Sequence, residues 1–204
     1  MLLSELEQDA LTELFNIGIG NAASAMNELL NEELKLSVPN IKILPRPCLS
    51  EVLQLQSNRI CGVHQSVSGL LRANAHLLFP EDKSLELVKL MLGERVPHGT
   101  LTEMQQEALC EIGNIILNAC VGAIANMLEN ECHSSLPSLY RGTMDQVISL
   151  SEAEAGPSEL TLVIFIDFTV EKHEIRGYLV FLLDTISLAD LKTVLAAFLQ
   201  KNGL

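Results

Sequence analysis

Basic side chains are scarce in this sequence. Lys and Arg number 13 against 26 Asp and Glu, which gives a net charge of -13 over 204 residues. Proteins that bind nucleic acid need a Lys/Arg surface against the phosphate backbone, so this balance excludes a nucleic-acid partner and disfavours an anionic membrane. A protein partner with a basic face is compatible with the charge, although many proteins are acidic only because charge keeps them soluble.

Long apolar runs and a secretory leader are also missing. No window reaches 18 uninterrupted apolar residues, and the opening MLLSELEQD is acidic by residue 5 and carries no positive segment. A membrane-spanning helix needs about 20 predominantly apolar residues, and a signal peptide starts with a positive segment before its apolar core. The sequence therefore predicts neither membrane insertion nor a signal peptide.

The cysteines do not form a pairing pattern. There are five, an odd number, two of them inside predicted helices, and the Cys/His neighbours at 61–64 and 132–133 have no second pair at zinc spacing. Disulfide scaffolds and zinc sites both need regular pairs. We therefore predict a reduced, cytoplasmic protein without a metal site. The cysteines are Cys48, Cys61, Cys110, Cys120 and Cys132.

What the sequence does contain is an internal repeat. Residues 3–17 (LSELEQDALTELFNI) and residues 101–115 (LTEMQQEALCEIGNI) share eight identities in fifteen positions at an offset of 98. Shared helix-forming composition alone would give fewer identities, so we interpret the match as a duplication. It predicts a single domain over residues 1–204 made of two repeats, about 1–98 and 99–204.

Each copy opens a long helix. Ser4 with Glu7, and Thr102 with Gln105, fit the capping box, in which two side chains satisfy each other's free backbone N–H groups. Apolar residues then recur at helical spacing. The long helices are predicted over about 6–33 and 103–130. The face of the first helix expected to be buried carries Leu6, Ala10, Leu14 and Ile17.

Strand-like segments and a short helix follow in each half. Strands are predicted at 41–44, 52–56, 59–67, 70–79, 146–150, 160–170 and 175–183. Short helices at 84–92 and 187–199 close the halves, which residues 94–99 join. With 48% hydrophobic and 19% charged residues the composition is that of a globular protein. We predict an α+β fold with a pseudo-twofold repeat, in which an antiparallel sheet packs against the two long helices.

Polar residues follow one side of each long helix at spacings i, i+4, i+7 and i+11, which places them in one row. The first stripe is Asp9, Glu13, Asn16 and Gly20, and the second stripe is Glu107, Glu111, Asn114 and Asn118. Either stripe alone is most simply a solvated face. The Glu and Asn nevertheless recur while neighbouring positions differ, and Asn is a mediocre helix former. This repetition favours a functional surface.

The side chains of the stripes have a definite chemistry. A carboxylate can pair with a cation, and an amide both donates and accepts hydrogen bonds. An amide so placed can orient a water for in-line attack on a phosphoryl group. No nucleophile–base pair is present in the stripes, so covalent catalysis is not indicated.

Glycines interrupt the first helix. The run Gly18-Ile-Gly20-Asn-Ala-Ala23 matches a loose dinucleotide fingerprint, but it follows no strand and lies within a helix, so nucleotide binding is not predicted. Each Gly costs about 1 kcal/mol of helix propensity against Ala. We interpret these glycines as allowing close approach, either of another helix or of a partner.

The stripes extend into a longer pattern. Asn16 and Asn114 each lie 23 positions before a proline, Pro39 and Pro137. The pattern Asp/Ser-x3-Glu-x2-Asn-x22-Pro resembles the signature of the CheC/CheX/FliY family of chemotaxis phosphatases. Two copies in about 200 residues, with no additional flagellar-switch domain, look most like the CheC branch. Glu107 departs from the pattern, since the family has Asp or Ser there, and its extra methylene predicts that the two sites are unequal.

The resemblance implies a function in two-component chemotaxis signalling in the cytoplasm. The implied reaction is hydrolysis of the aspartyl-phosphate of a CheY-type response regulator. By the resemblance Glu13 and Glu111 would contact the lysine of the receiver domain, and Asn16 and Asn114 would position the hydrolytic water. The first positions of the two motifs, Asp9 and Glu107, would contact the partner.

The resemblance also bears on cofactors and further partners. The receiver would supply its own Mg²⁺, so this chain would need no cofactor. The deamidase CheD is a possible second partner. The alternative function is a non-catalytic module that docks a receiver domain or CheD, and a structural flagellar-switch component is a weaker third reading.

Overall fold

In the computed structural model both long helices begin at the predicted capping boxes. The Ser4 hydroxyl accepts a hydrogen bond from the Glu7 backbone N–H (3.2 Å), and the Glu7 carboxylate accepts one from the Ser4 N–H (2.7 Å). The hydrogen bond from the Ser4 backbone holds the pKa of the Glu7 carboxyl below its ordinary value. Thr102 and Gln105 make the same pair of bonds at 3.3 and 2.8 Å. The long helices are α1 (Glu5–Leu30) and α4 (Glu103–Met127).

The structure describes residues 3–30, 34–53, 59–70, 72–92, 102–147, 149, 160–170 and 173–203. The strands are β1 (Leu34–Pro45), β2 (Ile60–Gly69), β3 (Ala73–Pro80), β4 (Cys132–Ser134), β5 (Ser138–Gly142), β6 (Leu160–Val170) and β7 (His173–Leu183). The shorter helices are the 3-10 turn η1 (Arg46–Cys48), α2 (Leu49–Leu53), α3 (Glu81–Leu92) and α6 (Thr185–Lys201).

The strands form one antiparallel sheet with a symmetric order. The order is β1-β6-β7-β3-β2, and β4 and β5 both pair with β2 at the far edge. The order reads the same from either edge when each strand is exchanged for its counterpart in the other half: β1 for β4/β5, β2 for β6, and β3 for β7. The pseudo-twofold axis therefore passes between β3 and β7, which pair directly. The predicted α+β fold is confirmed.

The boundary between the two repeats stays a prediction. It falls near residue 98, and the predicted joining segment 94–99 lies outside the described residues. Residues 151–159, an acidic segment of the sequence (SEAEAGPSE), also lie outside them.

The two prolines of the repeated pattern interrupt the two edge strands. The pairing of β1 with β6 shifts register between Ser37 and Asn40, where Pro39 lies. In the other half Pro137 falls in the gap that divides β4 from β5. Proline has no N–H to donate to a ladder, so sheets accept it at edges and bulges. This break explains why no strand was predicted at β4 and β5.

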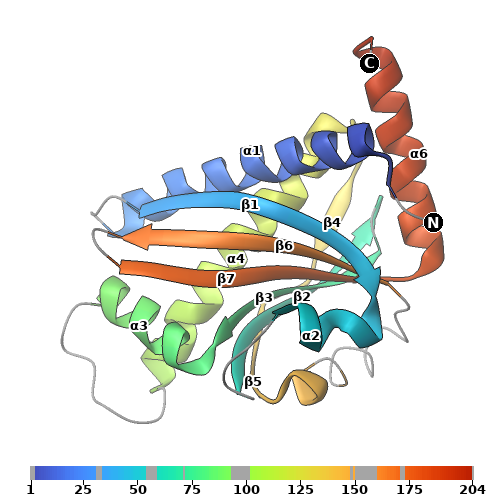
Figure 1. Ribbon diagram of the computed structural model, residues 1–204. Helices are drawn as coiled ribbons and strands as arrows, with labels where there is room; N and C mark the ends of the chain where they lie inside the picture. The colour runs from blue at the N-terminus through green and yellow to red at the C-terminus, as the bar shows by residue number, and fades with distance from the viewer. Residues whose placement is uncertain are drawn as a thin grey trace.

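The long helices cover one face of the sheet, with α1 along the β1 edge and α4 behind the strands (Figure 1). The buried side of α1 is centred on Leu11, Phe15 and Ala22, each 0% exposed. The predicted buried face was partly wrong, because Leu6 is 45% and Ile17 37% exposed. The helix packs against α4, β1 and α6 together, which rotates its core side away from these two residues.

Helix α4 is long and apolar enough to cross a membrane by length and composition alone. Of its most apolar window 56% is buried inside the fold, where α4 packs on α1 and on β2 and β3. A core helix of a globular fold has the same properties, so this composition is explained by packing.

Two predicted strands are wrong. The segment predicted as a strand at 52–56 begins within helix α2, and residues 146 and 147, the start of the strand predicted at 146–150, are helical. Short apolar runs have no periodicity that separates a strand from a buried helical turn. Both turns cover the opposite face of the sheet from the long helices, where Leu49, Leu53 and Val147 are buried.

Candidate functional site

The structure places both stripes on the solvent-facing sides of their helices. In the first stripe Asp9, Glu13, Asn16 and Gly20 are all exposed. In the second stripe Glu107, Glu111 and Asn118 are exposed, whereas Asn114 is half-buried. Small-molecule sites are concave and enclose their ligand. Exposed helix faces of this kind are suited to a macromolecular partner.

An exposed apolar side chain accompanies each stripe at the same position of the repeat. Leu6 is 45% exposed and Met104, its counterpart 98 residues later, is 65% exposed. Ile17, 37% exposed, lies on the same flank of the first stripe. Apolar groups grouped with polar ones on a surface are typical of protein-docking sites. Sequence reasoning missed this feature, because it assigned Leu6 and Ile17 to the core.

The two asparagines differ in their hydrogen bonds. Asn114 Oδ1 accepts from Gln65 Nε2 at 3.1 Å and from Asn118 Nδ2 at 2.8 Å. Within the part of the chain that the structure describes, the Asn16 side chain makes no hydrogen bond. The carbonyl oxygen of Asn114 therefore has both lone pairs engaged, while the amide of Asn16 keeps all of its donors and acceptors.

The difference follows from the residue that precedes each asparagine. A Cβ on Gly113 would lie 2.4 Å from the Val63 side chain, so α4 rests directly against β2 there. The counterpart in α1 is Phe15, whose ring is buried and lies 5.7 Å from that of Phe181. In α1 a ring therefore occupies the position where α4 carries only a hydrogen atom. Asn114 is thus held close enough to the sheet to reach a strand side chain.

That strand side chain is Gln65, only 1% exposed. Its Nε2 also donates to the Ser135 carbonyl oxygen at 3.1 Å. Its Oε1 is buried and has no hydrogen-bond partner among the residues that the structure describes. A buried unpaired acceptor costs about 1–3 kcal/mol. Sequence reasoning missed Gln65; the signal was a polar residue at an inward position of β2, between the buried Val63 and Val67.

The two glycines of the first helix differ in how closely other atoms approach them. A Cβ on Gly18 would lie 2.7 Å from the Cys120 Cα, so α1 and α4 cross in contact at this point. This is the close helix packing that the sequence allowed. Nothing lies within 4 Å of the corresponding Cβ position on Gly20, which leaves open space beside Asn16 in the first stripe.

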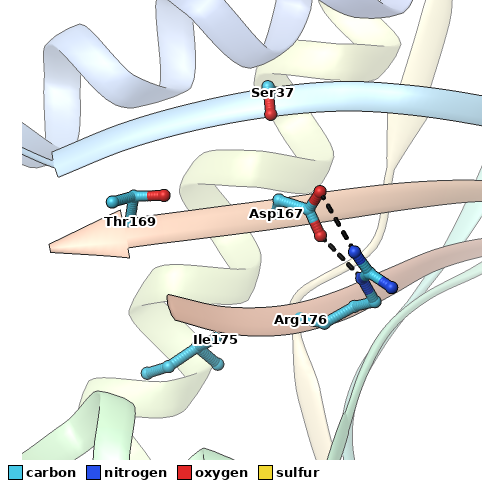
Figure 2. Close-up of a pocket in the computed structure, with 5 residues that line it drawn as sticks. All are labelled: Ser37, Asp167, Thr169, Ile175 and Arg176. Carbon is cyan, nitrogen blue, oxygen red and sulfur yellow. Dashed lines mark hydrogen bonds and ion pairs between the residues drawn. The ribbon is translucent and has the colours of Figure 1, made fainter. Parts of the chain in front are cut away.

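A polar cavity of about 350 Å³ lies elsewhere, over β1, β6 and β7. Its lining residues are Ser37, Asp167, Thr169, Ile175 and Arg176 (Figure 2). The Arg176 guanidinium donates to both Asp167 carboxylate oxygens, at 2.7 and 3.4 Å, across neighbouring strands. The cation and anion of the cavity are thus paired with each other, and no stripe residue lines it.

Metal-binding and thiol chemistry find little support in the described segments. Among the residues that the structure describes, no group of three or more His, Cys, Asp or Glu could hold a metal ion. All five cysteines are free, and burial raises the pKa of the Cys61 thiol to about 11. His64, which neighbours Cys61 in the sequence, instead hydrogen-bonds Asn74 Oδ1 through Nε2 at 3.1 Å. It is a buried residue whose ring has a hydrogen-bond partner.

Comparison with known proteins shows which sequences this chain resembles. Residues 6–43, which span the first stripe and Pro39, match the model of the CheC-like family. Over 97% of both chains the sequence is 24% identical to the CheY-P phosphatase CheC of Bacillus subtilis. This chain is similar in sequence to the CheC-like family. The acidic and Asn positions of the repeated pattern lie on α1 and α4.

Solved structures share the fold of this CheC-like chain. FliY of Thermotoga maritima aligns with a TM-score of 0.77 at 18% identity, covering 98% of this chain and 99% of that one. FliM in a FliG–FliM complex from H. pylori aligns at 0.69 and 8% identity, over 94% and 100%. A CheX–CheY–BeF3–Mg²⁺ complex from Borrelia burgdorferi aligns at 0.50 and 17% identity, over 82% and 94%.

Proposed function

We propose that this protein hydrolyses the aspartyl-phosphate of a CheY-type response regulator. The observation that carries the proposal is the display of the same Glu/Asn pair twice, on exposed helix faces, each beside an exposed apolar side chain. Such faces offer a carboxylate that can pair with a cation, an amide that can orient a water, and a small apolar contact for docking. They are suited to completing the active site of another protein.

In this mechanism the partner supplies the reacting groups. The receiver domain would bring its phosphoaspartate, its lysine and its Mg²⁺, so this chain would need no cofactor of its own. Glu13 and Glu111 pair with the receiver lysine, and Asp9 and Glu107 contact the partner beside them. Asn16 and Asn114 hold a water in line with the phosphorus. Water breaks the phosphorus–oxygen bond, releasing inorganic phosphate and restoring the aspartate carboxylate.

The relatives support this choice of reaction and partner. The B. subtilis relative is named for activity on CheY-P, and the related CheX is seen in complex with CheY. We also propose a cytoplasmic location and CheD as a second partner. The free thiols are in keeping with a reducing compartment.

The second candidate is a non-catalytic module that docks a receiver domain or CheD. The likeness of the fold to FliM, which is solved in complex with FliG, favours keeping this candidate, because there the fold serves in an assembly. The two candidates differ in what the asparagines do. A docking module needs the shape and charge of the stripes, whereas a phosphatase also needs the amides.

The wild-type protein alone separates the two candidates. We expect it to bind a phosphorylated CheY-type receiver and to speed loss of the phosphoryl group by about 100-fold, in the range expected for positioned hydrogen-bonding groups. The measurement pairs a binding titration against the beryllofluoride-bound receiver with phosphate release from the phosphorylated one. Saturable binding with no gain in phosphate release would instead favour the docking module.

A further inference from the structure

We propose that Gln65 is a positioning residue for the second stripe, and that it fixes which end of the Asn114 amide faces the partner. This inference rests on the proposed phosphatase function and assigns a role to a strand residue that lies outside the family pattern. It starts from the contact between Gln65 Nε2 and Asn114 Oδ1, at 3.1 Å.

The orientation of the Gln65 amide is set by the backbone. Its Nε2 lies 3.1 Å from the Ser135 carbonyl oxygen, which can only accept. Rotating the amide by half a turn would bring Oε1 against that oxygen and against Asn114 Oδ1. An acceptor would then face two other acceptors, and neither hydrogen bond could form. Gln65 is also 1% exposed, and packing limits its other rotamers.

This fixed donor in turn sets the orientation of Asn114. Asn114 turns Oδ1 toward Gln65 and Asn118. Its Nδ2, whose two N–H donors have no partner in the described part of the chain, is the group left for the receiver. The second stripe therefore presents an oriented donor, whereas Asn16 in the first stripe must be ordered when the partner binds.

The unpaired Oε1 of Gln65 supports a functional reason for this residue. An apolar side chain of similar length would leave no buried acceptor unsatisfied, so stability alone would favour Met at this position. Residues that lower stability in this way are typical of functional sites. A positioning role predicts that losing Gln65 harms turnover and not folding.

The test uses Gln65→Met in two backgrounds that each leave one stripe intact. In Asn16→Ala, where only the second stripe acts, we expect Gln65→Met to lower kcat by about tenfold, since small misplacements of a catalytic group have effects of this size or larger. KM and the urea midpoint should not fall. In Asn114→Ala, where only the first stripe acts, the same substitution should change kcat by less than about twofold.

Other outcomes overturn the inference. An equal loss in both backgrounds, or a loss that follows a lowered urea midpoint, would show that Gln65 only supports the fold. An unchanged kcat in the Asn16→Ala background, or no activity in that background to begin with, would also overturn it. Failure of the wild-type protein to release phosphate is a different result, because it removes the proposed function itself.

Discussion

Gly18→Ala is expected to lower the free energy of unfolding by about 1–3 kcal/mol, the usual effect of overpacking. The added Cβ would lie 2.7 Å from the Cys120 Cα, 3.1 Å from the Ala119 carbonyl oxygen and 3.2 Å from the Cys120 nitrogen. All three are backbone atoms of α4, which cannot rotate away, so α1 and α4 must separate. The loss should appear although Ala is the better helix former by about 1 kcal/mol.

Gly122→Ala is the matched control, since Gly122 also lies within a long helix and nothing is within 4 Å of its Cβ position. It should raise the free energy of unfolding by about 0.5–1 kcal/mol. Because the chain has no Trp, urea unfolding is best followed by far-UV circular dichroism. A Gly18→Ala protein as stable as the wild type would contradict the close crossing of the two helices.

Reversing the charge of both stripe glutamates should weaken receiver binding by about tenfold or more. In Glu13→Lys/Glu111→Lys each site would present a cation to the lysine of the receiver, and like charges across an interface cost up to several kcal/mol. Both sites must be changed, because either intact stripe could still bind. The dissociation constant, measured at low and high salt, should move toward the wild-type value as salt screens the repulsion.

A control variant separates this local effect from the change in overall charge. Glu51→Lys/Asp82→Lys alters two exposed carboxylates on α2 and α3, and like the glutamate pair it changes the net charge from -13 by four units to -9. It should bind almost as the wild type does. Equal weakening in both double variants would mean that the whole field of the protein, and not Glu13 and Glu111, attracts the receiver.

Local sequence signals predicted the starts of the two long helices well. The capping boxes at Ser4 and Thr102 located both helix starts, because such caps depend on residues three apart. The segments 52–56 and 146–150 failed, because a short apolar run is buried equally well as a strand or as a helical turn. The exposure of Leu6 was also missed, since it depends on how α1 lies against three neighbours.

For the candidate site, the sequence predicted the residues of the two stripes but not the contact between Asn114 and Gln65. The stripes follow from helical spacing alone, and the structure leaves them on the surface. The difference between Asn16 and Asn114 depends on contacts across 49 residues of chain, from Asn114 to Gln65. It originates in Phe15 and Gly113, a difference visible in the repeat whose consequence appears only when each helix is placed on the sheet.

The double variant Asn16→Ala/Asn114→Ala tests the central claim most directly. Its effect is measured as the rate at which a radioactive phosphoryl group is lost from the purified receiver, with each protein at a saturating concentration. The account predicts that the double variant binds the receiver as the wild type does and leaves the phosphoryl group to decay at the rate of the receiver alone. The expected loss is therefore the whole acceleration, about 100-fold. A double variant that binds and retains most of the wild-type acceleration would contradict the assignment of hydrolysis to these two amides.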